Sequence, residues 1–170
     1  MAIATVPPNE VRVGTTRWPE GVSLNPDDLC AMESAIRGVT VALTSAQILA
    51  LNSTPVTLVP AQGAGKIIIV DEILLEMTRT STAYANGGAL EFRYTNASGA
   101  KVTADIAASV VTTGGAGVEY NHVGGVVSSL TPVANAAIVV DNATAAFITG
   151  TGTAKIRVRF RVINTAAVGQ

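Results

Sequence analysis

The sequence predicts an all-β fold: a jelly-roll-like β-sandwich with an N-terminal extended arm and one or two short helices. Short apolar runs rich in valine and isoleucine are separated by clusters of glycine, asparagine and serine. Such turn signals, recurring about every 8–12 residues, are typical of a sandwich or barrel. Of the 170 residues, 48% are hydrophobic and only 14% are charged. So few charges indicate either a surface made of threonine, serine and asparagine or a surface that is largely buried against other molecules, as in a symmetric oligomer.

Two regions are expected along the chain, an N-terminal arm with a short helix over residues 1–38 and the sandwich over residues 39–170. From Met1 to Leu24 no helical or strand period persists, which indicates an extended arm. The helix is expected to follow, with Asn25 as N-cap and Gly38 as its end. Its apolar face would consist of Leu29, Met32 and Ile36.

A helical turn is expected over Thr44–Leu51, capped by Thr44 or Ser45, and strands fill the rest of the body. The length of Lys66–Met77 is compatible with one bent strand or with two. The other expected strands are Thr40–Leu43, Val56–Val59, Ala89–Thr95, Lys101–Ile106, Gly117–Val123, Ala136–Val140, Ala145–Thr149 and Ala154–Ile163.

The last strand has the clearest pattern, because apolar residues at even positions alternate with Arg157, Arg159 and Arg161. A strand with this period has one apolar face and one cationic face. The cationic face could be a solvated sheet surface, a protein interface or a nucleic-acid surface. No aromatic residue interleaves on it, as stacking on nucleic acid would need, so no nucleic-acid partner is expected.

A second candidate interface lies in the arm, where Trp18 stands beside Arg17 and near Arg12. Tryptophan and arginine are the residues most enriched in interface hot spots. The alternative is that Trp18 covers the core of its own domain. The candidate interface residues are therefore Arg12, Arg17, Trp18, Arg157, Arg159 and Arg161.

Catalytic residues are not evident. His122 is the only histidine, and no nucleophile and acid accompany it in a recognisable motif. We interpret it as a loop or strand residue. The alternative is a position on the axis of a trimer. Asp71 and Glu72 would face opposite sides of a strand, which argues against a carboxylate pair. Cys30 is the only cysteine, so neither an internal disulfide nor a cysteine-based metal site is expected. No cofactor and no metal are expected.

The glycine-rich stretch Gly63–Lys66 is interpreted as a turn. A phosphate-binding loop would need glycine where Pro60 stands and serine or threonine where Ile67 stands. The longest run of branched apolar residues, Ile67–Val70, is far too short to span a membrane, so no membrane partner is expected. The first residues do not resemble a signal peptide, and the single cysteine suits a protein made in a reducing cytosol.

About half of the chain resembles structural proteins of tailed bacteriophages. The resemblance lies in Leu43–Met77, in the loop Asn86-Gly87-Gly88 and in the following GALEFRYT stretch. It implies a jelly-roll-like capsid cement or decoration protein, a homotrimer on the capsid surface that bridges major capsid subunits in the virion and is made in the host cytoplasm. It supplies no catalytic residue, and the arm has no counterpart in it.

Two other functions remain open from the sequence. A head-fibre or tail-fibre module would bind a host-surface carbohydrate, but aromatic residues, which sugar sites use, make up only 4% of the chain. A small hydrolase on a β scaffold is the weakest hypothesis, because no acid–base set assembles.

Overall fold

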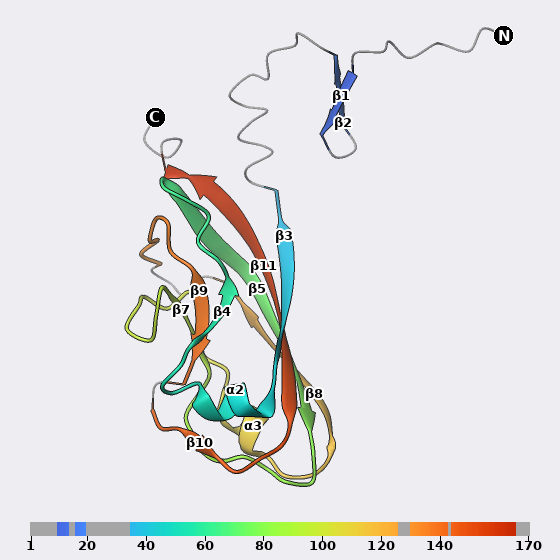
Figure 1. Ribbon diagram of the computed structural model, residues 1–170, viewed down its shortest axis with the longest axis vertical. Helices are drawn as coiled ribbons and strands as arrows, with labels where there is room; N and C mark the ends of the chain where they lie inside the picture. Colours follow the sequence, from blue (N-terminus) through green and yellow to red (C-terminus); the bar gives the residue numbers. More distant parts are fainter. Residues whose placement is uncertain (1–9, 14–15, 20–34, 126–129, 143, 166–170) are drawn as a thin grey trace, which may run out of the picture.

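The computed structural model describes residues 10–13, 16–19, 35–125, 130–142 and 144–165; in the first two ranges it describes the backbone alone. Within this part of the chain, strands predominate and two short helices are present, α2 (Ser45–Ala50) and α3 (Ser109–Thr112). Figure 1 shows two layers of strands, with α2 and α3 near one end of the body. Neither described helix has the length and apolar character that crossing a bilayer requires.

The body consists of two antiparallel sheets. The larger has the order β3-β11-β5-β8 and the smaller the order β4-β9-β7, so the predicted all-β sandwich is confirmed. The larger sheet is formed by β3 (Arg37–Leu43), β11 (Thr153–Asn164), β5 (Lys66–Arg79) and β8 (Gly117–Gly124). The smaller is formed by β4 (Val56–Val59), β9 (Ile138–Asp141) and β7 (Glu91–Tyr94).

Two further antiparallel pairs complete the described strands. β6 (Ala85–Asn86) pairs with β10 (Phe147–Ile148), and β1 (Glu10–Val13) pairs with β2 (Thr16–Pro19). The predicted arm therefore contains a hairpin within its first 24 residues. The predicted helix falls largely outside the described residues.

Several expected elements have the predicted place. β4 has the predicted bounds, and α2 begins after Thr44, whose hydroxyl accepts a hydrogen bond from the Gln47 amide in a capping box. β5 is one continuous strand rather than two. Gly38, expected to end a helix, lies instead inside β3 opposite Arg159, because pairing with β11 extends this strand back to Arg37.

The expected strand Lys101–Ile106 is wrong as a continuous element. This stretch makes only isolated bridges, two of them from Lys101 and Ile106 to the β7 side of the smaller sheet. The physical reason is that the middle residues do not stay paired with β7. Thr103 instead bridges to Gly125, which follows β8.

The core lies between the two sheets and is almost entirely apolar. β5 contributes Ile73 and Leu75, and β11 contributes Ile156 and Val158, all fully buried. From the smaller sheet Tyr94 reaches across, and its hydroxyl donates a hydrogen bond to the Ile68 carbonyl of β5. Burial raises the pKa of Tyr94 to about 12, so this bond between the sheets persists over the whole physiological pH range.

Candidate functional site

The outer face of the larger sheet, which points away from the smaller sheet, carries most of the exposed charged side chains of the sandwich. On β11 the even positions from 154 to 162 are buried, whereas Lys155, Arg157 and Arg159 are exposed. The alternation predicted from the sequence is therefore confirmed, with the cations on the solvent side.

Carboxylates on the neighbouring strand β5 pair with three of the four cations of β11. The Lys155 Nζ lies 3.0 Å from Glu76 Oε1, the Arg159 Nη1 3.3 Å from Glu72 Oε2, and the Arg161 Nη2 2.8 Å from Asp71 Oδ1. We call these pairs the ion-pair ladder. Each is partly solvated, so each contributes at most about 1 kcal/mol. The ladder neutralises most of the cationic stripe, which makes this face a poor match for a polyanion.

A β-bulge brings Asp71 into the ladder. Arg159 is paired with Glu72, but the next residue of β11, Phe160, is paired with Val70, so Asp71 is an extra residue on β5. Asp71 and Glu72 consequently both reach the outer face, where each pairs with an arginine. The expectation that they face opposite sides is wrong, because strict alternation fails at a bulge.

Arg157 is the cation that the ladder leaves unmatched. Its neighbours across the strands are Thr40 of β3 and Leu74 of β5, neither of which is charged. Among the described residues no hydrogen bond or ion pair to its side chain is found. A guanidinium group that is exposed and unpaired is free to bind an anionic group of another molecule.

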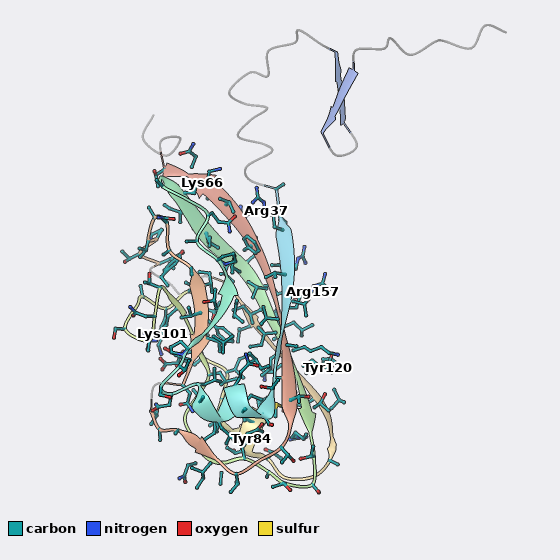
Figure 2. All side chains as sticks on the ribbon, in the orientation of Figure 1. Arg37, Lys66, Tyr84, Lys101, Tyr120 and Arg157 are labelled. Atoms are coloured by element: carbon teal, nitrogen blue, oxygen red, sulfur yellow. The ribbon has the colours of Figure 1, made fainter. Side chains whose placement is uncertain are left out.

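The strand β8 adds exposed apolar surface to the same face. Tyr120 is 63% exposed and Val118 is 54% exposed, and their partners on β5 are the outward-facing Glu76 and Thr78. Figure 2 shows Tyr120 and Arg157 projecting on the same side of the molecule. His122, also on β8, places its Nε2 3.6 Å from Glu72 Oε1 and so lies at the rim of the ladder.

A hollow of about 440 Å³ lies on the β3 side of this face. It is lined by Ile36, Arg37 and Gly38 together with Arg157 and Arg159, and we call it the arginine hollow. Arg37 was not predicted as part of a site, since the sequence placed it at the end of the arm. Arg161 does not line the hollow and is held by Asp71.

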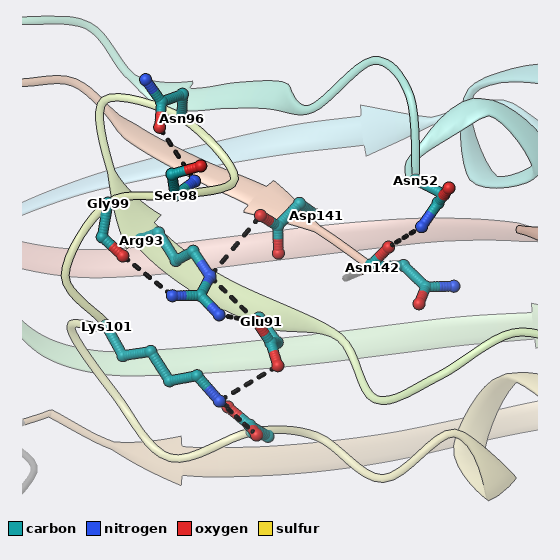
Figure 3. A network of polar contacts seen from close by, with 10 residues as sticks. Asn52, Glu91, Arg93, Asn96, Ser98, Gly99, Lys101, Asp141 and Asn142 are labelled. Carbon is teal, nitrogen blue, oxygen red and sulfur yellow. Dashed lines mark hydrogen bonds and ion pairs between the residues drawn. The ribbon is translucent and has the colours of Figure 1, made fainter. Parts of the chain in front are cut away.

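A second group of charges, the buried charge cluster, lies on the smaller sheet (Figure 3). Glu91 of β7 and Asp141 of β9 stand directly opposite each other, which places like charges together. Arg93 separates them: its guanidinium hydrogen-bonds Glu91 and lies 3.6 Å from Asp141 Oδ2. Lys101 completes the cluster, with Nζ 3.0 Å from Glu91 Oε1 and 2.7 Å from Asp105 Oδ2.

The two buried carboxyl groups have opposite pKa shifts. Burial alone would raise the pKa of Glu91, but hydrogen bonds from Lys101 and Arg93 outweigh it and lower this pKa. Burial raises the pKa of Asp141, which is 1% exposed and whose two carboxylate oxygens accept no hydrogen bond from the described residues. Hydrogen bonding to Asp105, together with the bond to Glu91, raises the pKa of Lys101. Glu91, Arg93 and Asp141 thus form the buried part of a structural network, in which Asp141 is poorly satisfied, and Lys101 and Asp105 form its partly exposed rim.

The arm candidates Arg12, Arg17 and Trp18 cannot be compared with this site, because their side chains lie outside the described residues. Their backbones are paired within the hairpin, Arg12 with Arg17 and Val11 with Trp18. In the described ranges no group of three or more histidine, cysteine, aspartate and glutamate side chains could hold a metal ion. The stretch Gly63–Lys66 is a turn, as interpreted, with the Lys66 amide donating to the Gly63 carbonyl at 3.2 Å.

The comparisons with known proteins add little to this geometry. No protein-family model matches the chain, and no curated protein matches it. A chain of the cyanophage Pam1 capsid asymmetric unit is similar in structure, with a TM-score of 0.40 and 17% sequence identity over 75% of this chain and 83% of that chain. A likeness at this TM-score supports no inference about the present chain.

Proposed function

We propose that this protein is a non-enzymatic structural protein of a tailed-bacteriophage virion, a capsid cement or decoration protein. The observation that carries the proposal is the strand order of the two sheets. The chain passes from one sheet to the other between β3 and β4, β4 and β5, β5 and β7, β7 and β8, β8 and β9, and β9 and β11. Residues 101–106 bridge to β7 where an eighth strand would lie. We therefore infer a jelly roll, a fold with eight strands in two sheets that is common among viral capsid proteins, in which residues 101–106 take the place of the eighth strand without forming a continuous one.

The proposed mechanism is thermodynamic. The sandwich associates as a homotrimer, and each trimer bridges several major capsid subunits on the outside of the virion. A ligand that binds only the assembled shell stabilises that shell by mass action. Several weak contacts made at once give a high overall affinity without one tight site. The protein is made in the host cytoplasm and joins the particle there.

The test compares particles with and without the protein. A cement protein is expected in copy numbers comparable to those of the major capsid protein, and particles lacking it should melt at a lower temperature. The solution mass of the free protein, measured by light scattering, should be that of a trimer. A monomer present in a few copies per particle, with no effect on capsid melting, would contradict the proposal.

The arm is proposed to supply part of the anchor. A variant lacking Met1–Leu24 should keep the sandwich and its trimer, because the two sheets involve none of these residues, but should lose binding to particles. A truncated protein that binds particles as well as the full chain would exclude this role.

A second candidate function is a head-fibre or tail-fibre module that binds a host-surface carbohydrate. The observation that favours it is Tyr120, an exposed aromatic side chain on a sheet face beside polar residues. A glycan array probed with wild-type protein and with Tyr120→Ala separates the two functions. Binding that is lost in Tyr120→Ala would favour the fibre module.

A further inference from the structure

The arginine hollow has the composition of an anion-binding site. Three arginine residues line it, Arg37 on β3 and Arg157 and Arg159 on β11, and among the described residues no carboxylate residue lines it. Among the described residues Arg157 has no partner, and the partner found there for Arg37 is the neutral Gln62, whose Oε1 lies 3.4 Å from the Arg37 Nη1. Arg159 makes a single 3.3 Å contact with Glu72. Most of the positive charge around the hollow is therefore not neutralised by the residues that the structure describes.

Gly38 leaves the space that a ligand would need. It stands opposite Arg159 on the outer face, and the absence of a side chain there opens β3 between the arginines. Crowding does not explain this glycine, because a Cβ built on it would meet nothing closer than the Val158 carbonyl oxygen at 4.0 Å. In a strand, glycine is less stable than a β-branched residue, so its presence has a stability cost that the fold does not require.

The rim of the hollow indicates which kind of anion would fit. Ile36 is 56% exposed and lines the hollow beside the arginines. An exposed apolar side chain next to guanidinium groups matches an acidic residue with an apolar neighbour on a protein, since guanidinium binds carboxylate through paired hydrogen bonds. A phosphate backbone offers no apolar partner. The ion-pair ladder also leaves the rest of the face nearly neutral, whereas nucleic acid needs an extended basic surface.

We propose that the arginine hollow is a docking site for a carboxylate side chain of a partner protein, presented beside an apolar residue. The choice of a protein as the partner rests on the proposed function, and the inference names the chemistry of that contact. Arg157 supplies the free guanidinium group, Arg37 and Arg159 add charge, and Gly38 admits the partner chain.

The test uses the full-length chain and a matched pair of labelled peptides. One is Gly-Leu-Asp-Glu-Leu-Gly and the other its uncharged twin, Gly-Leu-Asn-Gln-Leu-Gly, with inorganic phosphate and a short DNA duplex as further probes. The variants are Arg157→Ala, which removes the free cation, and Gly38→Val, which fills the hollow and raises strand propensity. Lys155→Ala is the control, because Lys155 is a cation of the same strand and face that does not line the hollow.

The acidic peptide should bind the wild type and the uncharged twin should not. Arg157→Ala and Gly38→Val should each weaken binding about tenfold or more, the size of one lost charge-assisted hydrogen bond, whereas Lys155→Ala should bind like the wild type. Urea unfolding should show that Gly38→Val is at least as stable as the wild type, so that loss of binding is not loss of fold. Equal binding of both peptides, no binding at millimolar concentration, preference for the duplex or for phosphate, or unchanged binding by both variants would each overturn the inference.

Rebinding of the same proteins to particles stripped of this protein separates the inference from the proposed function. If all variants rebind as well as the wild type, the hollow is not the contact, although the cement function stands. If the peptide results are as expected but the wild type does not bind particles, the docking site stands and the cement function fails.

Discussion

The two groups of charges in this protein, the ion-pair ladder and the buried charge cluster, contain the same kinds of side chain in opposite surroundings. The ladder lies on an open sheet face, where water solvates each partner and a pair contributes little. In the cluster the exposed fractions of the Glu91, Arg93 and Asp141 side chains are 12%, 17% and 1%. There each charge depends on its partners, because an unpaired buried charge is costly. The ladder therefore contributes little to stability, whereas the fold depends on the pairing within the cluster.

The largest difference between the two regions is expected when one arginine is removed from each. Arg93→Ala leaves Glu91 and Asp141 opposite each other without the guanidinium group that separates them. The free energy of unfolding should fall by about 3–5 kcal/mol, as for other buried pairs that lose one partner. Arg157→Ala, on the open face, should change it by less than about 0.5 kcal/mol. Urea unfolding of both variants makes the comparison, and similar losses in the two would show that the cluster is effectively solvated.

The next effect concerns Glu91 and has a defined pH dependence. Glu91→Gln should lower the free energy of unfolding at pH 7 by about 1.5–3 kcal/mol, because two charge-assisted hydrogen bonds weaken. The pKa of Glu91 is lowered below its usual 4.5 in the folded protein, so its contribution is complete above that value. The contribution is lost as the pH falls through the folded pKa. Unfolding curves of wild type and variant should converge in this acid range, and a constant gap down to low pH would contradict the assignment.

Replacing Asp141 should have the opposite effect on the free energy of unfolding from replacing Glu91. Its pKa is raised above the usual 3.8, so the ionised form is unfavourable in the folded protein. Asp141→Asn should increase the free energy of unfolding at pH 7 by about 1 kcal/mol, since an orphaned charge is replaced by an amide that can donate to Glu91. The advantage should shrink as the pH falls through the folded pKa and vanish below 3.8, where the wild-type carboxyl is protonated in both states. A variant less stable than the wild type at pH 7 would show that the Arg93 contact outweighs burial.

The sequence predicted those structural features that depend on residues close together along the chain. The alternation of β11, the bounds of β4 and the cap of α2 are local patterns, and all three are observed. α3 was missed because its sequence, Ser-Val-Val-Thr, has low helix propensity; it is helical although Val110 and Val111 are β-branched, and both are buried against the core. Here tertiary packing outweighs local preference.

The features of the candidate site that were missed are all properties of pairing between distant strands. Glu91 meets Asp141 only because β7 pairs with β9, and no local pattern indicates that contact. Arg37 joins Arg157 and Arg159 only because β3 pairs with β11. The apolar spacing that ends at Ile36 favoured a helix, so the sequence placed Arg37 in the arm. The register between strands that lie far apart in the chain cannot be derived from periodicity alone.

The smallest expected effect concerns the bulge itself. Deleting Asp71 would make the pairing of β5 with β11 regular, because Glu72 already faces Arg159 and Val70 already faces Phe160. Both halves of β5 would keep their buried and exposed sides. The losses would be the Asp71 partner of Arg161 and the hydrogen bond that the Asp71 carbonyl accepts from the Gly125 amide. The free energy of unfolding should therefore fall by about 1 kcal/mol.

Deletion of Ile73 is the matched control for this prediction, since it also shortens β5 by one residue. With Ile73 gone, Glu72 would take the fully buried position opposite Val158, and a carboxylate would replace an isoleucine in the core. This protein should fail to fold, whereas the Asp71 deletion should show a urea midpoint close to that of Arg161→Ala. If the Asp71 deletion were as damaging as the Ile73 deletion, the bulge would be needed to bend β5 over the core, and the ladder would contribute to the fold as well as to the surface.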